Sequence, residues 1–348
     1  MSSLQAKIAM EQAARPLFWG VDVGGTNIKI GLVDERGRTV RFETLATREA
    51  DGAQAAVDRI ASHCRAVEEE LGLGADDVPV VGLGTPGSMD IPSGYLLDPP
   101  NLPHWWNFPI RDAVAEATGR PVAFINDANA AAYGEFWVGT GRRQANMVLL
   151  TLGTGVGGGV VVNDELIEGT NSFGSECGHV IVDPSPTARL CVWGGGRGHL
   201  EAYASASAVV DRTRERLTAG GTSSLSGTLG GSDTELTAKE VYRAAEQGDS
   251  LALEIVDETA FWLGVGISSI IHIIDPGLVV LGGAMDFGGS ASPVGQRFLE
   301  RIRKEFRSRT FAHVADGTTI DFASLGGDAG YLGAAGYARK FYASRGRK

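Results

Sequence analysis

Two glycine-rich turns are the parts of this sequence best suited to holding a phosphate group. The first turn is Gly24-Gly25-Thr26, with Asp22 just before it and Lys29 just after it. The second turn contains Thr154 and Gly155. Glycine lets backbone N–H groups approach and surround a phosphate, because no Cβ atom stands in the way. The Asp22 carboxylate lies in an otherwise apolar strand, so it needs a partner such as a hydrated magnesium ion.

Each turn joins two apolar runs in the same way. The stretches 18–35 and 148–165 both contain a β-branched run, a turn rich in glycine and threonine, a second such run and a polar Asp-Glu corner. The two copies lie too far apart for a solenoid repeat, and their spacing fits two duplicated domains. We therefore expect a nucleotide held between two related halves, which is the arrangement of a phosphotransferase.

The sequence excludes two common nucleotide-binding motifs. Gly153–Gly158 matches Gly-x-Gly-x-x-Gly, but in a dinucleotide fold these glycines open a helix. Here Val160-Val161-Val162 follows instead, which predicts a strand. The chain contains no Gly-x-x-x-x-Gly-Lys-Ser/Thr sequence, so the P-loop is excluded as well.

The pair Asn126-Asp127 lies where a buried strand passes into a helix. Asp127 could serve only as the N-cap of that helix, a common and favourable role. It could instead be a carboxylate at the mouth of a cleft that accepts a proton from an attacking hydroxyl, while Asn126 binds a neighbouring hydroxyl. The local sequence leaves both interpretations open.

A third group of polar residues follows the second turn. It comprises Glu176, His179, Cys191, His199 and Glu201. Carboxylates accept hydrogen bonds from sugar hydroxyls and histidine can donate or accept them, so the group suits a polyol. Cysteine and histidine at such spacings can also hold zinc, and the histidines could equally be ordinary surface residues.

Strands and helices alternate along the chain, which predicts an α/β protein with two sheets. Besides the two hairpins, we expect strands at 38–45, 79–84, 122–125, 276–283 and 319–324. Helices are expected at 52–71, 110–118, 127–137, 205–217, 237–246, 251–274, 294–306 and 329–342. Residues 218–233 are rich in glycine, serine and threonine and are the best candidate for a mobile loop.

Composition limits the possible partners and compartment. The formal net charge of −11 argues against nucleic acid and against an anionic membrane surface. Three cysteines cannot form a complete disulfide framework, so we expect a reduced, cytoplasmic setting. Residues 1–16 have no continuous apolar core, so we expect a polar extension, with a helix as one option, rather than a signal peptide or membrane anchor.

Taken together, the motifs resemble the ROK family (repressor, open reading frame, kinase) of the actin-like sugar kinase superfamily. The resemblance extends from about Phe18 to Tyr342, and its most specific pieces are Asp22–Thr26, Asn126–Asn129, Gly153–Gly155, Glu176–His179 and Leu200–Ser205. It implies two actin-like, ribonuclease H-like lobes with mixed sheets flanked by helices, and a nucleotide and a sugar in the interdomain cleft. The small lobe would comprise 17–125 plus the C-terminal helix near 329–342, and the large lobe 126–328.

The resemblance also implies ATP, Mg²⁺ and a hexose or N-acylhexosamine as the bound molecules. Asp127 matches the catalytic base. The sugar-binding positions are matched by Gly87, Asn101, Asn126, Asp127, Glu176, His179 and Glu201. The nucleotide-binding positions are matched by Asp22, Gly24, Gly25, Thr26, Lys29, Thr154, Gly155, Gly282 and Gly283. Family members are often dimers or tetramers, so a homo-oligomer is expected.

The chain departs from the family at its zinc motif. The usual motif is Cys-x-Cys-Gly-x-x-Gly-Cys-x-Glu, whereas this chain has Trp193 and His199 where cysteines are expected, with one extra residue between. His179, Cys191 and His199 remain as possible zinc ligands, one short of a closed tetrahedral site. Zinc binding therefore stays open, and without zinc other packing must hold His179 against the sugar.

We expect the chain to transfer the γ-phosphoryl group of ATP to the 6-hydroxyl of glucose. Fructose, mannose and N-acetylmannosamine stay open as acceptors, because they differ from glucose by one or two groups. Polyphosphate stays open as the phosphoryl donor. A sugar-sensing transcriptional regulator is the non-enzyme alternative. Such proteins carry an N-terminal helix-turn-helix domain, and the roughly 17 residues before the first strand are too few for one.

Overall fold

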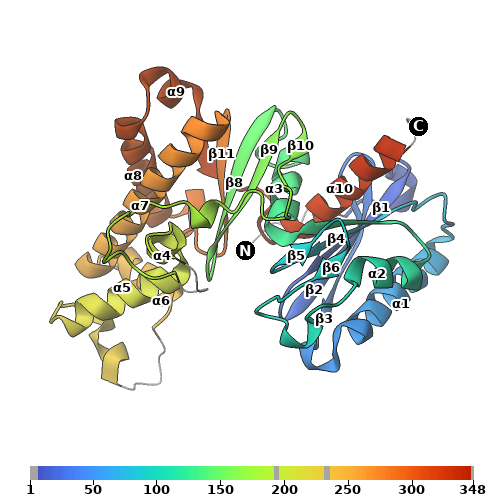
Figure 1. Cartoon of the computed structure of the whole chain (residues 1–348), viewed down its shortest axis with the longest axis horizontal. Coiled ribbons are helices and arrows are strands. Elements are labelled where there is room, and N and C mark those ends of the chain that lie inside the picture. Colours follow the sequence, from blue (N-terminus) through green and yellow to red (C-terminus); the bar gives the residue numbers. More distant parts are fainter. Residues whose placement is uncertain (1–6, 192–195, 231–235, 346–348) are drawn as a thin grey trace.

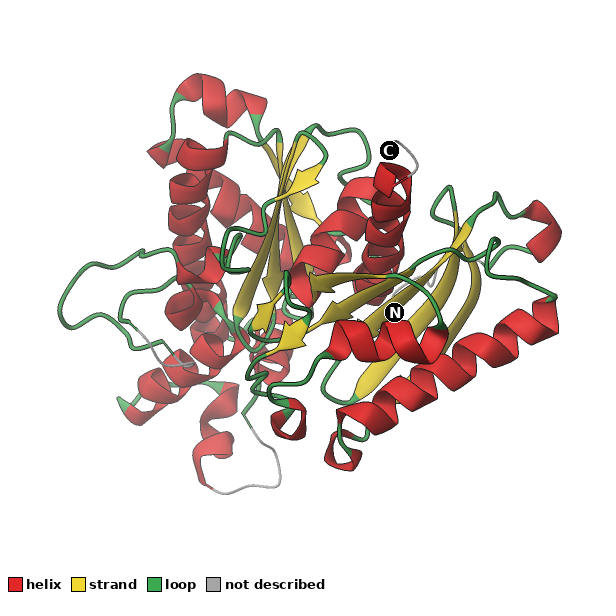
Figure 2. Ribbon diagram, turned by 45° about the vertical axis from the view of Figure 1, so that its right-hand side comes forward, coloured by secondary structure: helices red, strands yellow, loops and turns green. Residues whose placement is uncertain are grey.

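The computed structural model describes residues 7–191, 196–230 and 236–345 and arranges them in two lobes, each built on a five-stranded mixed sheet (Figure 1). Helices cover the faces of both sheets (Figure 2). The predicted α/β class with two sheets is confirmed. Among the described helices, none is both long enough and apolar enough to cross a membrane.

The first sheet has the strand order β3-β2-β1-β4-β7. Its strands are β1 (Leu17–Val23), β2 (Asn27–Asp34), β3 (Thr39–Ala46), β4 (Val81–Thr85) and β7 (Val122–Asn126). β1 pairs with β2 antiparallel across the first glycine turn and with β4 in parallel. β3 pairs antiparallel with β2, and β7 pairs parallel with β4.

The second sheet repeats this arrangement strand for strand. Its order is β10-β9-β8-β11-β12, formed by β8 (Asn146–Leu152), β9 (Val156–Val162), β10 (Glu165–Leu166), β11 (Leu278–Gly283) and β12 (Thr319–Phe322). β8 pairs antiparallel with β9 and parallel with β11, as β1 does with β2 and β4. The duplication expected from the two hairpins is therefore present in the topology.

Two helices lie between the sheets, α3 (Asp127–Trp137) and α10 (Ala329–Arg345) (Figure 1). α10 packs on one face of the first sheet, where Tyr331 and Leu332 meet Phe18. α3 packs on one face of the second sheet, where Ala132 meets Met147 and Leu149. The two helices also contact each other, so they connect the lobes.

Other helices cover the opposite faces. On the first sheet these are α1 (Ala53–Leu71) and α2 (Ile110–Thr118), whose apolar residues share a core with alternate residues of β1 such as Trp19. On the second sheet they include α5 (Ala206–Thr218), α6 (Ala238–Glu246), α7 (Ser250–Ile274) and α8 (Pro293–Arg309). Each sheet is therefore buried on both faces, which is why its parallel strands are nearly continuous apolar runs.

Several short elements were not predicted from the sequence. They include β5 (Met89–Asp90), β6 (Tyr95–Leu96), α4 (Glu201–Ala204) and α9 (Ala312–Gly317). Within the N-terminal extension, the described residues contain a single 3-10 turn, Met10–Gln12, and Ile8 N donates to Thr39 O at 2.9 Å. In the region predicted as a mobile loop, Ser224–Gly230 forms a 3-10 helix, and Gly231–Asp233 lie outside the described residues.

Candidate active site

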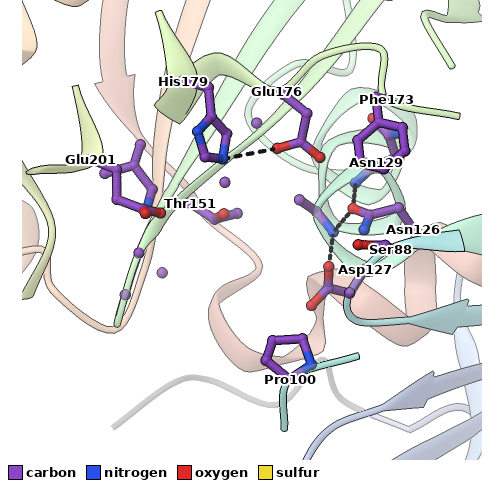
Figure 3. Close-up of a pocket in the computed structure, with 18 of the residues that line it drawn as sticks. Ser88, Pro100, Asn126, Asp127, Asn129, Thr151, Phe173, Glu176, His179 and Glu201 are labelled. Carbon is purple, nitrogen blue, oxygen red and sulfur yellow. Dashed lines mark hydrogen bonds and ion pairs between the residues drawn. The ribbon is translucent and has the colours of Figure 1, made fainter. Parts of the chain in front are cut away.

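A cavity of about 610 Å³ lies between the two lobes (Figure 3). Its walls come from the loop after β4, the start of α3, the turn between β8 and β9, the segment 172–179 and the end of β11. Parallel strands of both sheets therefore end at this cavity, which is where open α/β sheets bind their ligands. Figure 3 shows Glu176 and His179 above Asp127, and Glu201 to its left.

Asn126, and not Asp127, caps helix α3. Asn126 Oδ1 accepts hydrogen bonds from Ala128 N at 2.9 Å and from Asn129 N at 3.4 Å. Asp127 is the first residue of the helix, where its Oδ1 also accepts from Ala128 N at 2.8 Å. The interpretation of Asp127 as the N-cap is therefore wrong, and its carboxylate lines the cavity.

The Asp127 carboxylate binds a proton more readily than an exposed carboxylate does. Burial and the neighbouring charge of Asp22 raise its pKa to about 7, with a smaller contribution from Glu176. Burial also raises the pKa of Asp22 to about 6, although the charge of Lys29 acts in the opposite direction. Because an acid group titrating near neutrality can take up and release a proton at physiological pH, Asp127 has the proton affinity of a general base.

The donor set around Asp22 suits a magnesium ion. Asp22 and Asp127 are two carboxylates whose charges disfavour each other, and oxygen ligands of this kind are what Mg²⁺ prefers. The cation nearest in the hairpin, Lys29, stands opposite Asp22 in the β1–β2 register, and its Nζ donates to Gly327 O. These residues fit a hydrated divalent cation.

Glu176, His179 and Glu201 form the polar wall opposite Asp127. His179 Nε2 lies 4.0 Å from Glu176 Oε2, and burial raises the pKa of Glu176. Glu201 is buried, and its Oε2 accepts a hydrogen bond from Val156 N at 3.0 Å, which attaches it to the second glycine turn. Two carboxylates and an imidazole on one wall provide acceptors and a donor for several adjacent hydroxyls.

The three possible zinc ligands lie together. One ligand atom from each of His179, Cys191 and His199 lies within 4.8 Å of the others. His179 Nδ1 and His199 Nδ1 share a hydrogen bond of 2.9 Å, and Cys191 Sγ donates to Glu201 Oε1 at 3.3 Å. The set would fill three of the four positions of a tetrahedral zinc site, and Trp193 lies outside the described residues.

The predicted site residues fall into two groups. The cavity is lined by Gly87, Asn126, Asp127, Gly155, Glu176, His179, Glu201 and Gly283. The cavity lining does not include Asp22, Gly24, Gly25, Thr26, Lys29, Asn101, Thr154, Cys191, His199 or Gly282. Asn101 lies instead beside the first turn, since a Cβ atom built on Gly25 would be 3.4 Å from that of Asn101.

Some lining residues were missed by the sequence analysis. They include Ser88, Asp98, Pro100, Asn129, Thr151 and Phe173. Ser88 and Asn129 adjoin motifs that were recognised, so their positions were foreseeable. Asp98 and Pro100 follow the unpredicted β5–β6 hairpin, and Phe173 lies in a loop of the other lobe, so no local pattern indicates that they share a cavity.

Comparison with known proteins connects this arrangement to one family. The profile of the ROK family matches residues 18–340. A glucokinase from Thermotoga maritima is 39% identical over 318 residues, which cover 91% of this chain and 95% of the relative. Among solved structures, a ROK hexokinase from Thermus thermophilus is 31% identical with a TM-score of 0.79 and covers 94% of this chain and 99% of its own.

A second solved structure carries ligands. The ROK family glucokinase from Streptomyces griseus, in complex with glucose and AMPPNP, is 33% identical with a TM-score of 0.72 over 93% of this chain and 99% of its own. These neighbours share the two-lobe actin-like architecture with mixed sheets flanked by helices, as predicted. The duplicated sheets, the interlobe cavity and the matched sequence agree, and the chain belongs to the ROK family.

Proposed function

We propose that this chain is an ATP-dependent glucokinase that transfers the γ-phosphoryl group of ATP to the 6-hydroxyl of glucose. The observation that carries the proposal is the Asp127 carboxylate, which lies in the interlobe cavity, is not required as a helix cap, and has a pKa of about 7. The similarity to named glucokinases, one of them solved with glucose and AMPPNP, supports the substrate pair.

Asp127 acts as the general base in this proposal. It accepts the proton of the 6-hydroxyl as O6 forms a bond to the γ-phosphorus and the bond to the β–γ bridging oxygen breaks, releasing ADP. Phosphoryl transfer passes through a loose transition state, so positioning matters more than base strength. A positioned base contributes on the order of 10²- to 10⁴-fold in rate.

The two glycine turns hold the phosphates in this proposal. Backbone N–H groups at Gly25 and Thr26 in one lobe, and at Thr154 and Gly155 in the other, face the triphosphate. The Gly24 N–H instead donates to Asn27 O at 2.9 Å and closes the first turn. The end of β11 at Gly282 and Gly283 lies near the adenosine. Asp22 would hold Mg²⁺, which supplies positive charge to the phosphates when bound. Lys29 adds a second positive charge near Asp22.

The sugar lies against the polar wall in this proposal. Glu176, His179 and Glu201 bind its hydroxyls from the second lobe and Gly87 binds from the first, while Asn126 binds from the junction between β7 and α3. Because Asn126 Oδ1 is occupied by the helix cap, only its amide group is left to donate to the sugar. Asn101 stays a predicted sugar contact that would require the lobes to close.

Zinc, assembly and compartment belong to the same proposal. His179, Cys191 and His199 would hold a zinc ion that fixes His179 beside the sugar, and elemental analysis of the purified protein tests this directly. The two units are 17–125 with 329–342, and 126–328. We further propose that the protein is cytoplasmic and that it forms a homo-oligomer. Light scattering coupled to size exclusion would measure the mass of the oligomer.

The decisive experiment is an ADP-release assay with Mg²⁺, ATP and a panel of glucose, mannose, fructose and N-acetylmannosamine. Turnover with glucose at the highest kcat/KM is the expected result. Preference for another sugar would reassign the acceptor, and absence of turnover with every sugar would contradict the kinase assignment.

A further inference from the structure

Gly330 lies directly against the Asp22 carboxylate. Gly330 is the second residue of α10, and a Cβ atom built on it would lie 2.9 Å from Asp22 Oδ1 and closer still to Cγ and Oδ2. Real Cβ atoms essentially never come this close to a neighbour. The carboxylate therefore occupies the space that the Cβ atom of any other residue at position 330 would need.

The C-terminal segment also contacts the other polar group of the first hairpin. Lys29 Nζ donates to Gly327 O, three residues before Gly330. Asp22 and Lys29 face each other across β1 and β2, so one short segment, Gly326–Gly330, touches both. This segment joins β12 of the second lobe to α10, which packs on the first.

The helix has little freedom to move away from Asp22. A Cβ atom built on Gly333 would overlap the carbonyl oxygen of Ala130 in α3, and one on Gly20 would lie 2.9 Å from Ala335 N. Tyr331 and Leu332 are fully buried around the same turn. The Asp22 carboxylate, at the end of a short side chain, is the part that can rotate.

We propose that Gly330 is a positioning residue for the kinase reaction, which holds the Asp22 carboxylate in the orientation that the magnesium–nucleotide complex requires. A side chain at position 330 turns the carboxylate out of place while the fold is kept. The inference rests on the proposed function for the role of Asp22, and on the packing of Gly330 for its geometry. Asp22 also matters electrostatically, since its charge helps to raise the pKa of Asp127.

The test compares Gly330→Ala with Gly317→Ala, a matched control in which the added Cβ meets nothing within 4 Å. In Gly330→Ala we expect kcat to fall roughly 30-fold or more and the affinity for MgAMPPNP, measured by calorimetry, to fall about tenfold. Glucose affinity and the unfolding temperature should stay close to those of the control. Wild-type kcat and MgAMPPNP affinity in Gly330→Ala would overturn the proposal.

A double-mutant cycle distinguishes positioning from a general packing defect. If Gly330 acts through Asp22, adding Gly330→Ala to Asp22→Asn should change MgAMPPNP affinity by less than about twofold, because the affected group is already lost. If the affinity losses of the two single variants instead multiply in the double variant, the proposal is wrong. If Gly330→Ala does not fold, the double variant with Asp22→Ala should fold again, because it lacks the carboxylate atoms that clash with the new Cβ atom. A double variant that also fails to fold would contradict the proposed contact.

The calorimetric measurements do not depend on turnover. If the wild-type protein phosphorylates none of the sugars, the proposed function fails. The effect of Gly330→Ala on MgAMPPNP binding, and its dependence on Asp22, can still be measured and would still decide whether Gly330 positions that carboxylate.

Discussion

Asn126 and Asp127 are adjacent in sequence and divide two tasks at the start of helix α3. The Asn126 amide oxygen receives the hydrogen bond from Ala128 N at 2.9 Å that caps the helix, and the Asp127 carboxylate lines the cavity. The helix dipole favours a carboxylate at this position, but burial and the charge of Asp22 outweigh that effect and raise the pKa of Asp127 to about 7. The local structure therefore does not depend on Asp127 as a cap, and its substitution can be expected to affect chemistry more than folding.

Replacing Asp127 with Asn should abolish turnover and preserve sugar binding. The amide keeps the size of the side chain but cannot accept the hydroxyl proton, so we expect kcat to fall by on the order of 10²- to 10⁴-fold. Glucose affinity, measured by calorimetry, should change less than about threefold. Asp112→Asn is a suitable control, because Asp112 is an exposed acid in the first turn of α2. An Asp127→Asn protein with a near-normal rate would remove the assigned base.

The rate should depend on pH as the titration of Asp127 requires. A base with a pKa of about 7 is protonated and inactive below that pH, so kcat/KM for glucose should rise about tenfold per pH unit below pH 7 and level off above it. Initial rates between pH 5.5 and 8.5, with glucose and MgATP both well below saturation, measure this, because the pKa of about 7 is that of the site without Mg²⁺. A flat profile over the range would contradict the assignment.

The wild-type protein should lose stability as pH rises toward 7, and the Asp127→Asn variant should lack this loss. The folded-state pKa of about 7 lies above the ordinary value of 3.8, so the native state binds the proton more tightly than the unfolded chain. Folding stability is therefore lost as pH rises from about 4 to about 7. At pH 8 the Asn variant should be more stable than wild type by on the order of 2 kcal/mol, with no such gain near pH 4. Urea denaturation of the free protein at the two pH values tests this.

The sequence was sufficient for most of the architecture. The hairpins around Gly24 and Gly155 are recognisable because runs of apolar β-branched residues and turn glycines are local features, and their matching arrangement predicted two related sheets. Helix α2 has the predicted limits, Ile110–Thr118, because its apolar spacing and the glycine after it are local too. The position of Asp127 at a strand–helix junction could be predicted for the same reason.

The sequence did not predict which residues of the two lobes lie close to each other. Asp98 and Phe173 line one cavity although each lies in a loop without strong periodicity, and only the apposition of the lobes brings them together. The contact of Gly330 with Asp22 joins opposite ends of the chain. The choice between Asn126 and Asp127 as the cap could not be made either, since both residue types cap helices well.

Removing the His199 side chain should weaken glucose binding. His199 Nδ1 is hydrogen-bonded to His179 Nδ1 at 2.9 Å, which leaves His179 Nε2 facing Glu176. In His199→Ala the His179 ring loses this partner, and we expect the KM for glucose to rise about tenfold with the KM for ATP unchanged. His313→Ala, an exposed histidine in α9, is the control. Equal changes in both KM values would show a general disturbance instead.

Truncating Glu135 should destabilise the connection between the lobes. Glu135 is fully buried in α3, where its carboxylate accepts hydrogen bonds from Leu325 N at 2.7 Å and Thr140 N at 2.8 Å. Leu325 belongs to the segment that leads into α10, so this one side chain ties together the two helices between the sheets.

In Glu135→Ala both backbone donors lose their acceptor, and a buried unpaired donor costs about 1–3 kcal/mol. We therefore expect a loss of about 3 kcal/mol in the free energy of unfolding, measured by urea denaturation. Glu135→Gln keeps one acceptor oxygen and should lose less. Glu70→Ala, which removes an exposed carboxylate from α1, should change stability by less than about 1 kcal/mol. If Glu135→Ala were as stable as the Glu70 variant, these hydrogen bonds would not be what holds α3 to the start of α10.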